Sequence, residues 1–376
     1  MASHSRLTSP SAASRWINCP PSAQLNALYE DVGSTYAAEG TEAHELCEHI
    51  LRKAMGVETA DPRPGLEYYN EEMEDYAQGY AAYVLELLAG EKGRSADPIL
   101  LIEQRVDFSR WGGEGSFGTS DAIIIADGRM TVLDFKYGNR LVQVEGNAQV
   151  LCYGLGALAM FDGIFDVQEI TLGIYQPRRG NISSFTIPKS EVYAWAEEVL
   201  RPAAVLARAG EGEFACGEWC TFCKVGPTCR KRAETNMDLA RFDFRKPPQL
   251  GDEEVSEILA QVDDLVSWAS DLKDYALQAA LGGKQWSGWK LVEGRSVRRY
   301  ANEADVAASV IGAGCDPYEK KLLGITAMQK MLGKSQFEHL LGGLLEKPAG
   351  KPTLVAENDK RSAITMATQD FKENSR

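Results

Sequence analysis

The stretch Met130-Thr131-Val132-Leu133-Asp134-Phe135-Lys136-Tyr137-Gly138 decides the fold. It is a short apolar run, rich in residues that favour strands, and it ends in a carboxylate, an apolar residue and a lysine. Because side chains alternate along a strand, Asp134 and Lys136 share one face while Phe135 points into the core. A carboxylate beside an ammonium group can hold a divalent metal and orient a water, the chemistry of metal-assisted phosphodiester hydrolysis. An Asp-x-Lys pair alone is common, and most such pairs are surface ion pairs of small energetic effect.

A second strand, Gly118 to Ile125, precedes the first, and Asp127-Gly128 between them predicts a tight hairpin turn. Asp121 and Asp134 each lie six residues from that turn. The antiparallel register therefore predicts that the two carboxylates face each other. Such a pair is destabilising unless a cation lies between them, so the sequence predicts a metal site here.

Apolar periodicity predicts the elements around this hairpin. Helices are expected within 38–51, from Thr41 onward, and at 70–88 and 147–158, and further strands at 99–107, 167–175 and 182–187. Thr41 is the expected N-cap of the first helix, on which His44 and Glu48 share a face, as Gln149 and Tyr153 do on the third. The pattern predicts an α/β fold in which helices flank a mixed central sheet.

Composition narrows the class of protein. The chain has 376 residues, of which 44% are hydrophobic and 25% charged, with a net charge of −14. We expect a cytoplasmic protein without a membrane partner, since neither a signal core nor a long apolar run is evident. The negative net charge argues against a general nucleic-acid binder. Any nucleic-acid site must therefore be a local basic patch or a metal-centred cleft. The glycine-rich loop Gly112 to Gly118 lacks the Lys-Ser/Thr of a nucleotide-binding P-loop.

Four cysteines lie close together in the sequence, and a fifth lies near the N-terminus. Cys220, Cys223 and Cys229 have C-x2-C-x5-C spacing, with Cys216 four residues ahead of them. Dense cysteines in a cytosolic chain indicate zinc or an iron–sulfur cluster rather than disulfides. Either the four local cysteines form the site, or Cys19 is the fourth ligand and joins the N-terminus to this loop.

Five motifs in order resemble the PD-(D/E)xK nucleases of the RecB/AddB type, and in particular the small iron–sulfur exonucleases similar to those of CRISPR adaptation. The motifs are Gly-Thr-x-x-His at His44, Gly-x-x-Asp at Asp121, Asp134-x-Lys136, Gln149-x3-Tyr153, and Cys19 paired with C-x2-C-x5-C. The resemblance covers residues 19–229. It implies a restriction-endonuclease-like core and a [4Fe–4S] cluster held by Cys19, Cys220, Cys223 and Cys229. Cys216 departs from the family pattern, which keeps zinc as an alternative.

The same resemblance implies a role for each site residue. His44, Asp121, Asp134 and the Phe135 carbonyl would bind Mg²⁺ or Mn²⁺. Lys136 would orient or deprotonate the attacking water and balance the charge of the transition state. Gln149 and Tyr153 would position the scissile strand. Glu48 and Glu103 are second-line candidates.

We expect three regions: a nuclease domain at 1–235, a mainly helical accessory domain at 236–346, and a flexible tail at 347–376. The accessory domain is expected to contain a linker at Phe244 to Pro248, a long helix at 251–281 and an Arg/aromatic hairpin at 286–300 that could contact phosphates and bases. This extension resembles the uncharacterised extension of phage-borne nucleases and is a candidate surface for a protein partner.

These observations predict a Mg²⁺- or Mn²⁺-dependent DNA nuclease, an exonuclease acting on single-stranded DNA or DNA ends in phage-type replication, recombination or repair. One alternative is a non-catalytic nucleic-acid-binding or assembly module that retains the fold. Another, a zinc-ribbon interaction protein, explains only residues 216–229. The acidic balance indicates that DNA affinity depends on a partner or on assembly into a homo-oligomer.

Overall fold

A computed structural model of the chain describes residues 7–30, 33–95, 97–238, 251–292, 302–312, 317–318 and 322–345. It divides into two compact units, Met1–Ala279 and Ala280–Arg376.

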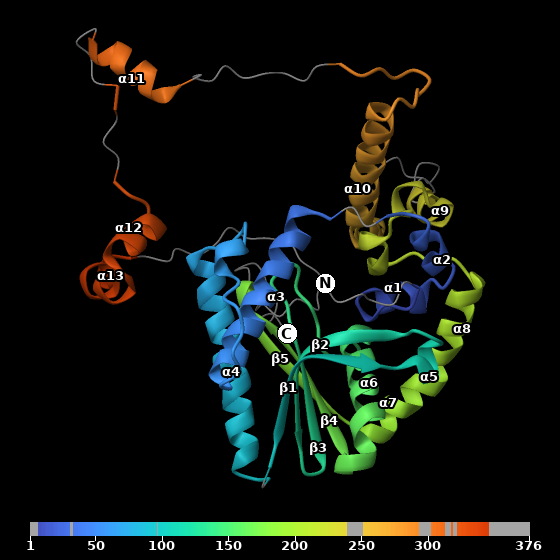
Figure 1. Cartoon of the computed structure of the whole chain (residues 1–376). Coiled ribbons are helices and arrows are strands. Elements are labelled where there is room, and N and C mark those ends of the chain that lie inside the picture. Colours follow the sequence, from blue (N-terminus) through green and yellow to red (C-terminus); the bar gives the residue numbers. More distant parts are fainter. Residues whose placement is uncertain are drawn as a thin grey trace, which may run out of the picture. The chain divides into compact units, whose positions relative to one another are not determined.

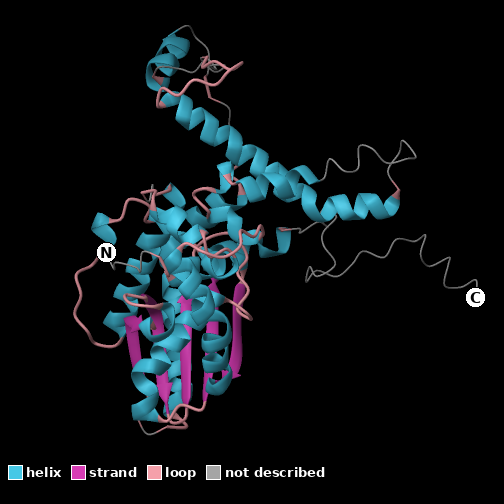
Figure 2. Ribbon diagram, turned by 90° about the vertical axis from the view of Figure 1, so that its right-hand side faces the viewer, coloured by secondary structure: helices cyan, strands magenta, loops and turns pink. Residues whose placement is uncertain are grey.

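The first unit is a mixed α/β fold built on one five-stranded sheet (Figures 1 and 2). The strands are adjacent in chain order: β1 Ile99–Asp107, β2 Phe117–Ala126, β3 Arg129–Phe135, β4 Glu169–Gln176 and β5 Asn181–Pro188. The pair β3 and β4 is parallel, and the other neighbours are antiparallel. The structure confirms the expected mixed sheet flanked by helices, and each predicted strand lies within about two residues of its observed bounds.

The β2–β3 hairpin has the predicted register. Ala122 pairs with Leu133 and Ala126 with Arg129, so continuing the ladder by one residue places Asp121 opposite Asp134. The turn at Asp127-Gly128 is possible because Gly128 has a φ of +72°, a conformation that glycine adopts without strain. The register of this hairpin therefore brings the two acidic residues to the same end of the sheet.

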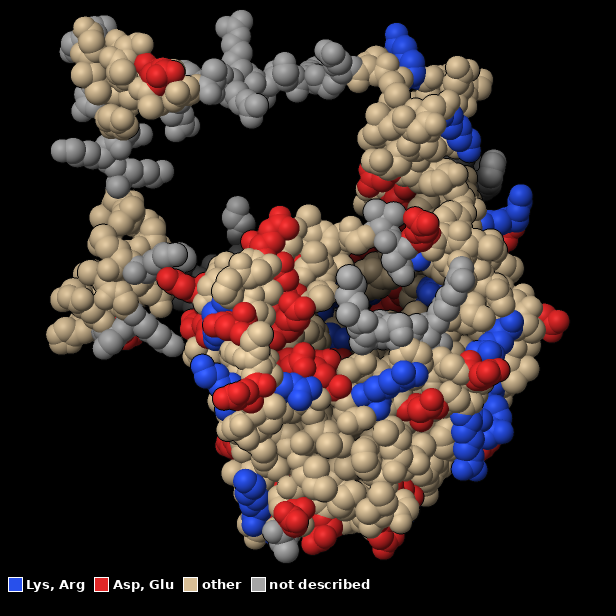
Figure 3. Space-filling view, viewed as in Figure 1, with Lys and Arg blue, Asp and Glu red and all other residues tan. Residues whose placement is uncertain are grey.

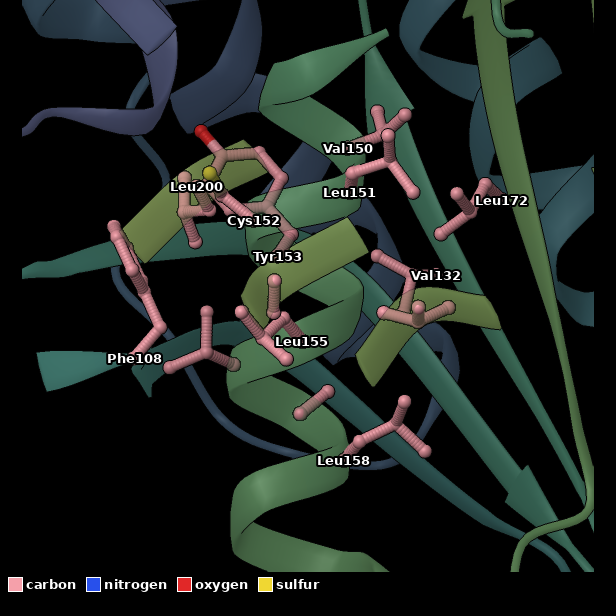
Figure 4. Close-up of a cluster of buried hydrophobic side chains, with 14 of the residues drawn as sticks. Phe108, Val132, Val150, Leu151, Cys152, Tyr153, Leu155, Leu158, Leu172 and Leu200 are labelled. Atoms are coloured by element: carbon pink, nitrogen blue, oxygen red, sulfur yellow. The ribbon is translucent and has the colours of Figure 1, made fainter. Parts of the chain in front are cut away.

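Helix α6, Ala148–Phe165, connects the parallel strands β3 and β4 and covers one face of the sheet (Figure 4). Its side chains Leu155 and Leu158 are fully buried against strand residues such as Val132 and Leu172. By length and composition it is the one helix among the described residues that could cross a membrane, but half of it is buried inside the fold. The apolar character of α6 is explained by its position over the core.

Helices α3, Thr35–Ala54, and α4, Glu71–Lys92, cover the opposite face of the sheet (Figure 1). The predicted N-cap of α3 was wrong. The cap is Ser34, seven residues earlier, and its side chain accepts a hydrogen bond from the Ala37 N–H. Thr41 lies inside the helix, and its hydroxyl donates to the Ala37 carbonyl. The N-cap of α4 is Asn70, as expected.

The remaining helices of the first unit surround these layers. They are α1 Ala13–Asn18, α2 Ser22–Ala27, α5 Ser109–Gly112, α7 Lys189–Trp195, the π-helix η4 Ala196–Leu200, α8 Arg201–Ala209 and α9 Arg230–Met237. Short 3₁₀ turns are η1 Pro10–Ala12, η2 Arg63–Gly65, η3 Pro177–Arg179, η5 Glu218–Phe222 and η6 Gly226–Thr228. The turns η5 and η6 lie within residues 216–229, the segment called the cysteine loop below.

The long helix predicted after the linker is α10, Asp252–Leu281. The boundary between the units falls near its end rather than before it, because Arg232 of α9 pairs with Asp271 and the Trp268 indole N–H bonds to the Pro227 carbonyl. The predicted linker at 244–248 lies outside the described residues.

The helices described in the second unit are α11 Glu303–Gly312, α12 Ile325–Leu332 and α13 Lys334–Leu341, with the 3₁₀ turn η8 Gly342–Leu344. The predicted Arg/aromatic hairpin is described only from 286 to 292, and this half forms a turn and irregular backbone without a strand. Its remainder at 293–300 and the predicted tail at 347–376 lie outside the described residues.

Leu158→Ala should lower the free energy of unfolding by about 2–5 kcal/mol, because it opens a cavity between α6 and the sheet. Ile164→Ala on the same helix is the matched control, since that side chain is 75% exposed, and it should change stability by less than about 0.5 kcal/mol. Urea unfolding followed by circular dichroism measures both. Equal effects of the two substitutions would contradict the assigned packing of α6.

Candidate functional site

Three acidic residues from three neighbouring strands form a row across the sheet. The β1–β2 register places Glu103 opposite Asp121, and the β2–β3 register places Asp134 on the other side of Asp121. Asp121 and Asp134 are buried, with 8% and 2% of their surface exposed. Carboxylates are costly to bury side by side, so each needs a compensating partner.

Asp121 is the centre of this row and is held from two sides. Its Oδ1 lies 3.0 Å from the His44 Nδ1 of α3, and its Oδ2 accepts a hydrogen bond of 2.6 Å from the Phe135 N–H. Although burial opposes ionisation, these partners keep the pKa of Asp121 below its usual value. The Phe135 ring packs edge-on against the imidazole with a centroid separation of 5.3 Å, which helps to fix His44.

The pKa values of His44 and Glu103 are both raised, and the negative charge of Asp121 contributes to each shift. Burial lowers the pKa of His44, but the attraction of Asp121 outweighs it and raises the value to about 9. Burial, reinforced by repulsion from Asp121, raises the pKa of Glu103 to about 8. A metal ion bound at this site would therefore displace protons, because ligands bind metals in their deprotonated forms.

Asp134 is held by the residues that the Asp-x-Lys and Gln-x3-Tyr motifs single out. The Lys136 Nζ lies 2.8 Å from Asp134 Oδ2 and donates a 2.9 Å hydrogen bond to Gln149 Oε1. The Gln149 amide in turn lies 3.4 Å from Asp134 Oδ1 and 2.9 Å from the Tyr153 hydroxyl. Burial and the charge of Asp121 raise the pKa of Asp134 in spite of Lys136.

Gly118, the glycine of Gly-x-x-Asp, explains how α6 approaches this end of β2. A Cβ added there would lie 2.6 Å from Pro10 Cγ and 2.7 Å from Tyr153 Cε1. Only glycine leaves room for the Tyr153 ring beside the strand. This close approach brings the Gln149–Tyr153 pair of α6 to the carboxylates of β2 and β3.

The residues present fit a divalent metal ion. His44, Glu103 and Asp121 can each offer one ligand atom, with these atoms within 4.8 Å of one another. Asp134 Oδ2 adds a buried oxygen that has the Lys136 ion pair but no well-aligned hydrogen bond among the described residues. Carboxylate oxygens with one imidazole suit Mg²⁺ or Mn²⁺.

Sequence reasoning gave Glu103 too little weight. The backbone of Glu103 has a φ of +50°, a strained conformation for this residue type within a strand. In this conformation the Glu103 carboxylate lies beside His44 and Asp121. The alignment of Glu103 with Asp121 follows from the β1–β2 register, which no hairpin turn in the sequence specifies. The predicted ligand role of the Phe135 carbonyl stays a prediction, since the described contact of Phe135 is through its N–H.

The cysteine loop lies against the N-terminal segment. Asn26 of α2 donates a hydrogen bond of 3.3 Å to the Cys223 Sγ, and its side-chain oxygen accepts one of 2.8 Å from the Lys224 N–H. Cys19, between α1 and α2, is buried, and α1 packs on the η5 turn that carries Cys220. The Cys216 and Cys220 Sγ atoms are 4.0 Å apart. All five cysteines are free thiols in this structure.

The fold and site define an α/β protein with a buried acidic centre suited to a divalent metal. The chain belongs to the family described as "Protein of unknown function (DUF2800)", which matches residues 4–362. A solved structure titled "Crystal structure of SSO0001" is 14% identical and covers 51% of this chain and 98% of its own, with a TM-score of 0.22. A similarity at that TM-score carries no conclusion about fold or function.

Asp134→Asn should weaken Mn²⁺ binding, because it removes one negative charge and one ligand oxygen from the centre. The wild type should gain about 2.7 kcal/mol of stability at a Mn²⁺ concentration 100 times its Kd, visible as a rise in Tm that EDTA reverses. The variant should lose most of that rise. Thermal unfolding with and without Mn²⁺ measures it.

The matched control for this substitution is Asp162→Asn. Asp162 also pairs with a lysine, at 2.9 Å from the Lys189 Nζ, but away from the centre, so this variant should keep the full response to Mn²⁺. An equal loss in both variants, or a Mn²⁺ response in neither the wild type nor the control, would contradict the assigned metal site.

Proposed function

We propose that this protein is a metal-dependent deoxyribonuclease, an exonuclease that acts on single-stranded DNA or DNA ends in phage-type replication, recombination or repair. The observation that carries the proposal is the row Glu103–Asp121–Asp134, with Lys136 placed 2.8 Å from the last carboxylate. Buried carboxylates beside one lysine are costly in a protein that has no cation to bind. Metal-assisted phosphodiester hydrolysis uses both a cation held by carboxylates and a positively charged side chain beside it.

The fold supports the finer assignment to a PD-(D/E)xK core. In this proposal β1, β2 and β3 carry the acidic residues, α6 carries Gln149 and Tyr153, and β4 completes the parallel pair. The proposed roles follow the contacts. A bound Mg²⁺ or Mn²⁺ ion would supply charge neutralisation at the scissile phosphate and lower the pKa of a water. His44, Glu103, Asp121 and Asp134 would hold that ion.

Lys136 is proposed to hold the attacking water and to balance the negative charge that develops on the phosphate. The hydrogen bond from its ammonium group to Gln149 Oε1 fixes its direction, and the bond from Gln149 to the Tyr153 hydroxyl fixes the amide in turn. Gln149 and Tyr153 would therefore position both the lysine and the scissile strand.

Acidic side chains are prominent over α3 and α4 on the face seen in Figure 3. This distribution, with a net charge of −14, disfavours long-range attraction of DNA to the protein alone. We therefore propose that affinity comes from contacts at the centre itself, assisted by a protein partner at the C-terminal extension or by homo-oligomer assembly.

For the cysteine loop we propose a [4Fe–4S] cluster on Cys19, Cys220, Cys223 and Cys229. The hydrogen bonds of Asn26 to the loop support the joining of the N-terminal segment to these cysteines. A tetrahedral zinc ion would draw its sulfur atoms to within about 3.8 Å of one another. The 4.0 Å separation of the Cys216 and Cys220 sulfur atoms is close to that value, so zinc on the four local cysteines stays the alternative.

The nuclease proposal is tested by degradation of end-labelled single-stranded DNA with Mn²⁺ and with EDTA. Wild type should cleave only with metal, and Lys136→Ala should lower the rate by at least about 100-fold while keeping the Mn²⁺-induced rise in Tm. Tight DNA binding without cleavage by the wild type would instead identify a non-catalytic nucleic-acid-binding module. Unchanged cleavage by Lys136→Ala would remove the lysine from the mechanism.

The cluster proposal is tested by anaerobic purification with iron analysis and visible absorbance. Wild type should be brown, Cys220→Ser should lose iron and colour, and Cys216→Ser, the matched control, should keep both. A colourless protein that contains zinc, or loss of iron in Cys216→Ser alone, would contradict the ligand assignment.

A further inference from the structure

Phe222 is an aromatic residue whose ring the fold leaves in solvent. The side chain is 79% exposed, although it ends the η5 turn between Cys220 and Cys223. The turn itself is fixed, since the Cys223 N–H bonds to the Cys220 carbonyl at 3.1 Å and the Thr221 hydroxyl bonds to the Glu218 carbonyl at 2.8 Å. The ring therefore projects from a rigid loop and contributes little to the core. A single exposed apolar side chain is ordinary on a protein surface, so exposure alone assigns no role.

A cation from the loop that follows β3 lies beside this ring. The Arg140 guanidinium carbon is 5.9 Å from the centre of the Phe222 ring, and Arg140 Nη2 is 3.8 Å from the Glu218 carboxylate of the same turn. Arg140 is itself half-exposed, with 51% of its side-chain surface open to solvent. An exposed aromatic face with an adjacent guanidinium is the combination that single-stranded nucleic-acid sites use, since the ring stacks on a base and the arginine pairs with the backbone or stacks too.

The backbone of Arg140 is fixed relative to the proposed centre. Gln176 at the end of β4 is fully buried, and its amide donates hydrogen bonds to the carbonyls of Gly138 at 2.7 Å and Arg140 at 2.6 Å. Arg140 follows Lys136 by four residues, so their Cα atoms are at most about 14 Å apart. The Lys136 N–H is bonded to the Tyr175 carbonyl, which anchors the start of this segment to β4. The segment from Lys136 to Arg140 thus links the centre directly to the cysteine loop.

We infer that Phe222 and Arg140 form a stacking platform for an unpaired base of single-stranded DNA whose phosphodiester occupies the proposed centre. This inference rests on the proposed nuclease function and adds a substrate preference to it. In a duplex the faces of each base are covered by the neighbouring bases. The platform therefore contributes to the binding of an unpaired strand and not to the binding of paired DNA. It also gives an acidic protein a source of affinity that does not depend on net charge.

The test is the affinity of the full-length protein for fluorescein-labelled oligothymidylate, measured by anisotropy in EDTA so that no cleavage occurs. Phe222→Ala should weaken binding roughly 5- to 150-fold, the range for loss of one stacked base. Phe222→Trp should restore binding, and Arg140→Gln should weaken it. Ile164→Ala, which removes a side chain of similar exposure from α6, should bind as wild type does. Binding of blunt duplex DNA should be the same for wild type, Phe222→Ala and Ile164→Ala.

Wild-type affinity of Phe222→Ala for oligothymidylate, or an equal loss of duplex binding, would overturn the platform. The nuclease proposal is tested separately with bis(p-nitrophenyl) phosphate, which carries no base. If the proposed centre is active, wild type and Phe222→Ala should hydrolyse this diester at equal rates with Mn²⁺. Absence of hydrolysis of both diester and DNA, with the oligothymidylate defect intact, would remove the nuclease function and keep the platform as a binding site.

Discussion

The site depends on how one buried carboxylate, Asp121, is satisfied. Its two oxygens are taken by an imidazole from α3 and by the backbone N–H of Phe135 from β3, so the same side chain joins a helix to two strands. Both partners favour the ionised form, which leaves a fixed negative charge between two further acidic residues whose pKa values are raised. An arrangement of this kind has an unfavourable electrostatic energy that a divalent cation would relieve.

Much of this arrangement could be predicted from the chain. The Asp127-Gly128 turn fixes the hairpin register, and the register alone places Asp121 opposite Asp134. The helical spacing of Gln149 and Tyr153 correctly places them on one face of α6, where they contact each other and Gln149 contacts Lys136. In each case the information is local, because a tight turn or a helical period relates residues close in sequence.

The parts that could not be predicted depend on contacts between distant segments. Glu103 joins His44 and Asp121 because β1 pairs with β2 and because its own backbone adopts a positive φ, neither of which is visible in the residues around it. Ser34 rather than Thr41 caps α3, since the helix extends about two turns further than its apolar face requires. Asn26 holds the cysteine loop across nearly two hundred residues of sequence, and an asparagine in a short helix gives no signal of such a role.

The Lys136–Arg140 segment connects the acidic centre to the loop that carries Phe222, and the central claim of this account is the metal assignment at that centre. The most direct test is a crystal structure of the protein soaked in Mn²⁺, with anomalous data collected at the manganese edge. The account predicts a peak bounded by His44, Glu103, Asp121 and Asp134, with Lys136 moved from its contact with Asp134 or turned toward a metal-bound water. A map without a peak there, and with the Lys136–Asp134 pair unchanged, would contradict it.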